Sequence, residues 1–214
     1  MTQPTDNLMS AAPLSAIGDI GRLLKSSTRE FVFACRVPEP QVPLFGSFVR
    51  APAQKNQSAV IGLIYNIAIA DDQFVKQMVA GSDSLSEEQF EIYVLDNRER
   101  RKVPIEVSVL AIGYCRDGVY VHDLPPQPPI TLDKIYNCTD AEIRQFTTQF
   151  DYLQLILASA DAPADQLIAA SLAKAASVQP NGRRFLENAG RQLAVLLSRD
   201  LVRLQNLLQR IKPA

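Results

Sequence analysis

The chain's single histidine, His122, is followed by Asp123 at the end of a β-type segment. A histidine beside a carboxylate is an arrangement used in general acid–base catalysis, and imidazole is also a common metal ligand. Either role needs further groups at suitable spacing, and the sequence places no second histidine and no cysteine at ligand spacing from His122. We therefore interpret His122 as a partly exposed residue at a strand end.

The other reactive residue types are equally isolated. Cys35, Cys115 and Cys138 are far apart and show no C-x-x-C spacing, which predicts neither a zinc site nor a disulfide framework. The serines lack the G-x-S-x-G context of an activated nucleophile. We predict a protein that is not an enzyme and that uses no metal and no cofactor. Reduced thiols favour the cytoplasm.

The densest basic run comprises Arg98, Arg100, Arg101 and Lys102, with Glu99 among them. The run lies between two β-type segments, so a hairpin tip is expected. Such a tip contacts phosphate groups or an acidic protein surface, or it is a solvated turn that protects a sheet edge. A net charge of -1 gives the chain no overall attraction to nucleic acid.

The elements that must position these residues are β-type from Glu30 onward. Val-, Ile-, Phe- and Tyr-rich segments separated by turn residues predict six short strands: EFVFACRV, LFGSFVRA, SAVIGLIYNIAI, QFEIYVLDN, VPIEVSVLAIGY and GVYVHDL. This pattern indicates a small closed barrel or a sandwich. The preceding SAIGDIGRLLKSS fits a short helix or an entry strand. Gly46 and Gly62 predict a bulge, a sharp bend or a close backbone approach.

The pattern changes to helix after Asn137. Thr139 and Glu142 have the spacing of a capping box, Pro163 opens a further helix, and Asn181-Gly182 marks the break before the last one. From there to the C-terminus, leucines at steps of three and four predict one continuous helical face. The face packs inside the protein or against another chain. The candidate partner-binding positions on it are Leu197, Leu201, Leu204 and Leu208.

The segment Leu124 to Ile143 begins with four prolines in five residues, at positions 125, 126, 128 and 129. Proline fixes φ and removes a backbone donor, so the segment leaves the sheet in an extended form. An ordered segment and a capping box follow at once. We predict a short stiff strap between ordered elements, which disfavours both a flexible linker and a proline-rich ligand for an SH3-type domain.

The succession of FGSFVRA, VIGLIYNI, IEVSVLAIGY and LPPQPPITLDKIYNCTDAEI resembles the HAS barrel, the β-barrel shared by HerA-type ATPases and F-type ATP synthase subunits. The resemblance spans about Glu30 to Gln145 and rests on four short features. These are Gly46-Ser47, where the family usually has an acidic second residue, Gly62, Pro125-Pro126, and Thr139 to Glu142. It implies a barrel that packs against neighbouring subunits or partners.

The chain departs from HerA-type proteins in lacking a G-x-x-x-x-G-K-[ST] loop, so ATP hydrolysis is not carried over. The expected fold is α+β, with a small N-terminal antiparallel β-barrel followed by a C-terminal helical region. The expected parts are a tail and entry segment at 1–29, the barrel at 30–138 and the helices at 139–214.

The expected function is a non-enzymatic protein-interaction or assembly module that docks on a ring ATPase or a related complex, or that self-associates. The alternative is a nucleic-acid-associated accessory factor that uses the basic hairpin tip. No apolar run is long enough to span a membrane, so no membrane insertion is expected.

Overall fold

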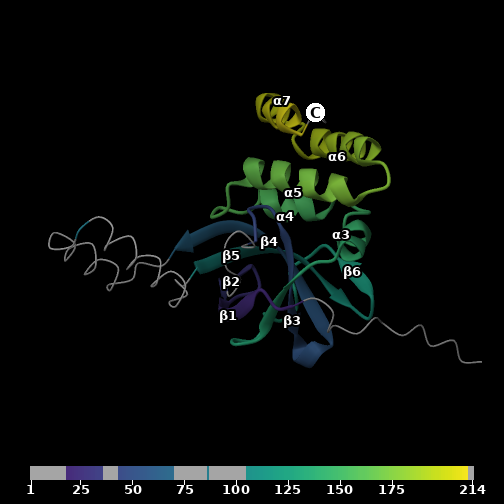
Figure 1. Ribbon diagram of the computed structural model, residues 1–214. Helices are drawn as coiled ribbons and strands as arrows, with labels where there is room; N and C mark the ends of the chain where they lie inside the picture. Colours follow the sequence, from purple (N-terminus) through teal and green to yellow (C-terminus); the bar gives the residue numbers. More distant parts are fainter. Residues whose placement is uncertain (1–17, 36–42, 70–85, 87–104, 212–214) are drawn as a thin grey trace, which may run out of the picture.

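The structure is a computed structural model in which residues 18–35, 43–69, 86 and 105–211 are described. Figure 1 shows a β-barrel with a stack of helices on one side of it. α3, α4 and α5 lie nearest to the barrel, and α6 and α7 form the outer end of the stack. The fold is therefore α+β, as the sequence predicts.

Six antiparallel strands form the barrel in the order β2-β1-β7-β3-β4-β5, and the pairing of the last strand, β5, with the first, β2, closes the ring. A further strand, β6, pairs with β5 outside the ring. The bounds are β1 (Gly21–Ser26), β2 (Glu30–Cys35), β3 (Phe48–Ala53), β4 (Ser58–Ile69), β5 (Ile105–Arg116), β6 (Val119–Val121) and β7 (Lys134–Asn137). Because the sheet closes on itself, the sandwich alternative does not apply.

Two of the closing strands come from segments that the sequence left undecided. The entry segment SAIGDIGRLLKSS supplies β1, so the barrel strands begin at Gly21 within the expected tail and entry range. The segment after the prolines supplies β7, which joins β1 to β3 through two register pairs on each side. The predicted strand QFEIYVLDN lies outside the described residues.

The proline strap therefore lies within the barrel, between β6 and β7, and the helices begin only after β7. Pro125 and Pro129 are buried, and the Ser26 hydroxyl donates a hydrogen bond of 2.7 Å to the Pro129 carbonyl. The strap is an ordered connection between two strands, as predicted, but it does not join the barrel to the helices.

The strand β5 shows why one barrel supports two hydrophobic cores. Val107 and Val109 point into the barrel, where they pack with Phe31, Phe33 and Ile64. The alternate residues Leu110 and Ile112 face the helices. Successive side chains of a strand point to opposite faces, so a strand that is apolar at both registers builds a core on each side.

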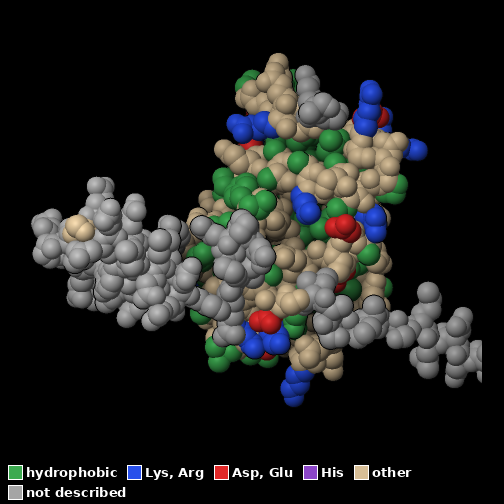
Figure 2. All heavy atoms as spheres, viewed as in Figure 1, with side chains coloured by type: hydrophobic (Ala, Val, Ile, Leu, Met, Phe, Trp, Pro, Cys, Tyr) green, Lys and Arg blue, Asp and Glu red, His purple; other side chains and the backbone are tan. Residues whose placement is uncertain are grey.

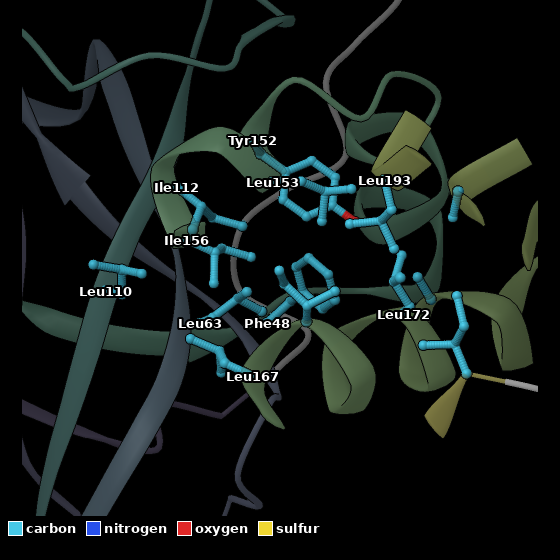
Figure 3. Packing of buried hydrophobic residues seen from close by; sticks show 14 of the residues in the cluster. Phe48, Leu63, Leu110, Ile112, Tyr152, Leu153, Ile156, Leu167, Leu172 and Leu193 are labelled. Carbon is cyan, nitrogen blue, oxygen red and sulfur yellow. The ribbon is translucent and has the colours of Figure 1, made fainter. Parts of the chain in front are cut away.

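Five helices follow: α3 (Asp140–Phe146), α4 (Tyr152–Leu157), α5 (Ala164–Val178), α6 (Gly182–Leu196) and α7 (Leu201–Arg210). The predicted capping box is present at Thr139, and Pro163 and Asn181 precede α5 and α6 as predicted. Figure 3 shows the core that these helices form with the outer barrel surface, in which Tyr152 and Ile156 of α4 lie among Leu63, Ile112 and Phe48. None of the described helices has the length and hydropathy needed to cross a membrane.

The prediction of one continuous leucine-faced helix after Asn181 is wrong. Helix α6 ends at Leu196, and a separate helix, α7, begins at Leu201. The Asp200 carboxylate caps α7 by accepting a hydrogen bond from the Arg203 backbone N–H. The break rotates the later leucines out of line. Leu197 is buried, Leu204 and Leu208 are half-buried against the core, and Leu201 is 68% exposed.

Both glycines singled out in the sequence sit at close approaches. Gly46 has φ of +79°, and a Cβ built there would lie 2.5 Å from the Ala170 Cβ of α5. Gly62 lies at a register shift between β4 and β5, where a Cβ would lie 2.4 Å from a methyl carbon of Val109. A side chain at either position would push the helices or the neighbouring strand away.

Candidate functional site

An ion pair joins the barrel to the helical stack. The Arg50 Nε of β3 lies 3.2 Å from the Glu142 Oε1 in the first turn of α3, and the two side chains are only 10% and 25% exposed. The Nε–H makes no aligned hydrogen bond, so the contact is ionic. The Arg50 guanidinium also lies over the Tyr136 ring of β7, 5.1 Å from its centroid.

The other oxygen of Glu142 completes the capping box. The Glu142 Oε2 accepts hydrogen bonds from the backbone N–H of Thr139 at 2.7 Å and from its hydroxyl at 2.9 Å. The Thr139 hydroxyl oxygen in turn accepts from the Glu142 N–H at 3.1 Å. One carboxylate therefore starts α3 and holds the helix against β3. The capping box was visible in the sequence, whereas nothing local marked Arg50 as its partner.

A pocket of about 210 Å³ opens beside this pair, and its lining includes Arg50, Glu142, Cys115, Tyr120 and residues of the β3–β4 turn. Burial is the main cause that raises the pKa of both the Tyr120 hydroxyl and the Cys115 thiol. Both groups are therefore protonated at neutral pH and poorly nucleophilic. The Glu142 carboxylate is already engaged by Arg50 and Thr139.

The turn at the rim of this pocket is held in an unusual backbone conformation. Gln54, Lys55 and Asn56 all have positive φ, at 51°, 56° and 68°. The Gln54 side-chain oxygen accepts hydrogen bonds from the Ser58 hydroxyl at 3.0 Å and from the Arg116 guanidinium at 2.7 Å. These two bonds tie the turn to β4 and β5, which offsets the cost of three consecutive left-handed residues.

His122 is more buried than the sequence suggested, since α3 and α4 cover it and its side chain is only 7% exposed. Its Nε2 lies 2.9 Å from the Phe146 carbonyl oxygen, an acceptor, so the neutral ring carries its proton on Nε2. The ring contacts the edges of Phe146 and Tyr152. Burial lowers the His122 pKa, with the Phe146 carbonyl and Asp151 acting in the opposite direction. These contacts give His122 a packing role.

The candidate partner-binding residues separate into two groups. Arg98, Arg100, Arg101 and Lys102 lie outside the described residues. Of the four leucines, Leu197 is buried and Leu204 and Leu208 pack partly against the helical core, so these three stabilise the stack. Only Leu201 remains largely available to another molecule.

Leu201 belongs to a group of exposed apolar residues at the α6–α7 connection. Val195 near the end of α6 is 68% exposed, and Val202 in the first turn of α7 is 72% exposed. We call Val195, Leu201 and Val202 the apolar corner. These are three exposed apolar side chains within eight residues of chain.

A second surface, which the sequence reasoning missed, follows α6 from its N-cap Asn181 to Arg191. It is a shallow cleft of about 380 Å³, here called the arginine cleft, and it is lined by Asn181, Arg183, Arg184, Glu187, Asn188 and Arg191. Figure 2 shows Lys and Arg side chains projecting from this helical end of the molecule. The spacing of seven between Arg184 and Arg191 was a usable signal, because residues seven apart share a helical face.

No cluster of three or more His, Cys, Asp or Glu side chains that could hold a metal ion occurs in the part of the chain that the structure describes. The candidate sites in the described residues are the Arg50–Glu142 pair with its small pocket, the apolar corner and the arginine cleft. A scan against protein-family models finds no match to the chain, and a search of curated proteins finds no significant relative. The resemblance to the HAS barrel accordingly stays a prediction.

Proposed function

We propose that this chain is a non-enzymatic protein-interaction and assembly module, in which the barrel carries a helical stack that presents a docking surface. The observation that supports the proposal most directly is the apolar corner, where Val195, Leu201 and Val202 lie exposed at the outer end of the stack. Burying an exposed Val or Leu side chain on association stabilises a complex by ~1.5–3 kcal/mol before ordering costs.

Contacts of α7 with α5 and with the helical core fix the position of the apolar corner. The Arg203 Nη2 of α7 lies 2.7 Å from the Asp165 Oδ1 of α5, and the Arg203 Nε donates to the same oxygen at 2.8 Å. Leu207 and Ile211 of α7 are buried in the helical core. A corner that is positioned before binding loses less conformational freedom when a partner binds.

The partner class follows from the sequence resemblance. HAS barrels belong to ring ATPases and related complexes, while this chain has no phosphate-binding loop of its own. We propose a ring ATPase, a related complex or a second copy of this chain as the partner of the apolar corner. The observations that favour protein binding over chemistry are the exposed corner and the protonated, engaged state of the side chains around the barrel pocket.

A pair of matched variants tests the proposal. Leu201→Asp places a charge in the apolar corner, and Val119→Asp makes a comparable change at an exposed apolar position of β6. Light scattering reports self-association, and affinity capture with quantitative mass spectrometry reports ATPase partners. We expect Leu201→Asp to abolish the assembly and Val119→Asp to retain it. A monomer whose captured proteins are unchanged by Leu201→Asp would contradict the proposal.

A further inference from the structure

Helices α6 and α7 carry a local excess of positive charge, which is separate from the apolar corner. Residues 182–211 contain six arginines and only two acidic residues, Glu187 and Asp200, although the whole chain has a net charge of -1. Three of these arginines, Arg183, Arg184 and Arg191, line the arginine cleft. A local excess of this kind produces a field at the surface even on a chain that is nearly neutral overall.

Among the described residues, few acidic side chains pair with these arginines. Arg203 is paired with Asp165 outside the cleft. Within the cleft, the Arg183 Nε lies 3.3 Å from the Glu187 Oε1, but both side chains are largely exposed, so this pair is weak. The ion pairs among the described residues include no acidic partner for Arg184 or Arg191.

The lining of the arginine cleft indicates the chemistry of its ligand. Every lining residue is an arginine, an asparagine or Glu187, and the cleft has no aliphatic or aromatic anchor. The core of a protein interface needs such anchors, and single-stranded nucleic acid needs aromatic rings on which its bases stack. Phosphate groups need neither, because guanidinium donors bind two phosphate oxygens at once.

The geometry of α6 fits a row of phosphates. Arg184 and Arg191 are seven residues apart on one helical face, which places them about 10.5 Å apart along the axis, so each can contact a different phosphate. The Asn181 side chain occupies the Arg184 backbone N–H at 2.9 Å, which leaves the anion contacts to the arginine side chains. We propose that the arginine cleft binds the phosphate backbone of duplex nucleic acid without reading its sequence.

The test is fluorescence anisotropy of the full-length chain with a labelled 20-base-pair DNA duplex, titrated at several salt concentrations. Arg184→Gln/Arg191→Gln removes two cleft cations, and Arg29→Gln/Lys25→Gln removes two exposed cations of the barrel as the control. We expect the cleft variant to weaken binding at least tenfold and to lower the slope of log K against log salt by about 2, since each phosphate contact contributes about 0.9. The control should change the affinity less than twofold.

Glu187→Gln supplies a test of opposite sign. The carboxylate of Glu187 repels a phosphate and competes for Arg183, so its removal should tighten duplex binding about twofold or more. Circular dichroism spectra identical to the parent show that the exposed substitutions leave the fold intact. Absence of salt-sensitive duplex binding at low ionic strength, or an equal loss in the barrel control, overturns the proposal. Tighter binding of labelled polyglutamate with the same dependence on the cleft would assign the surface to acidic proteins and would also overturn it.

Discussion

The Arg50 side chain of β3 and the Glu142 carboxylate of α3 meet 3.2 Å apart, at the point where the barrel ends and the helices begin. The same carboxylate accepts two hydrogen bonds from Thr139, so it is both a helix cap and a contact between the barrel and α3. The ion pair therefore couples formation of α3 to its docking on the barrel.

Replacing Glu142 by Ala should destabilise the protein by about 3 kcal/mol. The change removes the reciprocal cap and leaves the buried Arg50 charge without its partner, a cost reduced because Glu142 is partly solvated. Urea unfolding measures the difference. Glu187→Ala serves as the control, since it breaks an exposed ion pair and should cost less than about 0.5 kcal/mol. Equal effects of the two substitutions would show that the junction contributes no special stability.

Gly46 and Gly118 form a matched pair for testing the contact between the barrel and α5. Both have positive φ, +79° and +77°, but a Cβ at Gly46 meets Ala170 whereas a Cβ at Gly118 meets open space. Gly118→Ala should therefore cost about 1 kcal/mol from backbone strain alone, and Gly46→Ala about 2–4 kcal/mol because steric overlap is added. Thermal and urea unfolding report both values. A Gly46→Ala protein as stable as the Gly118→Ala protein would refute the close approach of α5.

Leu207→Ala and Leu201→Ala test the division of the last helical segment into α6 and α7. Leu207 is fully buried in the core, so its truncation should cost about 2–5 kcal/mol. Leu201 is exposed, and its truncation should change the free energy of unfolding by less than about 0.5 kcal/mol. In a single helix with the predicted leucine face, Leu201 would be buried and Leu207, six residues further on, would lie off that face, so truncating Leu201 would be the costly change. Denaturant titration distinguishes the two outcomes.

His122 should make stability depend on pH in the mildly acidic range. Burial lowers its pKa in the folded protein below the usual 6.5, so the unfolded chain binds the proton more readily. The contribution to stability is complete above pH 6.5 and declines as the pH falls toward the folded-state pKa. Urea unfolding between pH 5 and pH 8 should show a steeper acid-side loss for the parent than for His122→Gln. Parallel pH profiles would show that His122 is not the responsible group.

The local pattern of the sequence determined most individual elements. The Val-, Ile- and Leu-rich segment VPIEVSVLAIGY predicts a strand, and in the structure the two faces of that strand contribute to two different cores. The capping box at Thr139, the proline before α5 and the Asn181 cap of α6 each act within a few residues, so they are readable from the chain alone. The α+β class followed from the succession of these elements.

Tertiary structure decided how the elements meet. Closure of the barrel depends on β1 and on the four-residue β7, which become barrel strands through pairing with partners distant in the chain. The break at Asp200 turns Leu201 toward solvent, because a short cap interrupts a periodicity that the leucines alone would continue. The Arg50–Glu142 pair joins residues distant in the chain. Such relationships arise from contacts between elements, and sequence periodicity carries information only within one element.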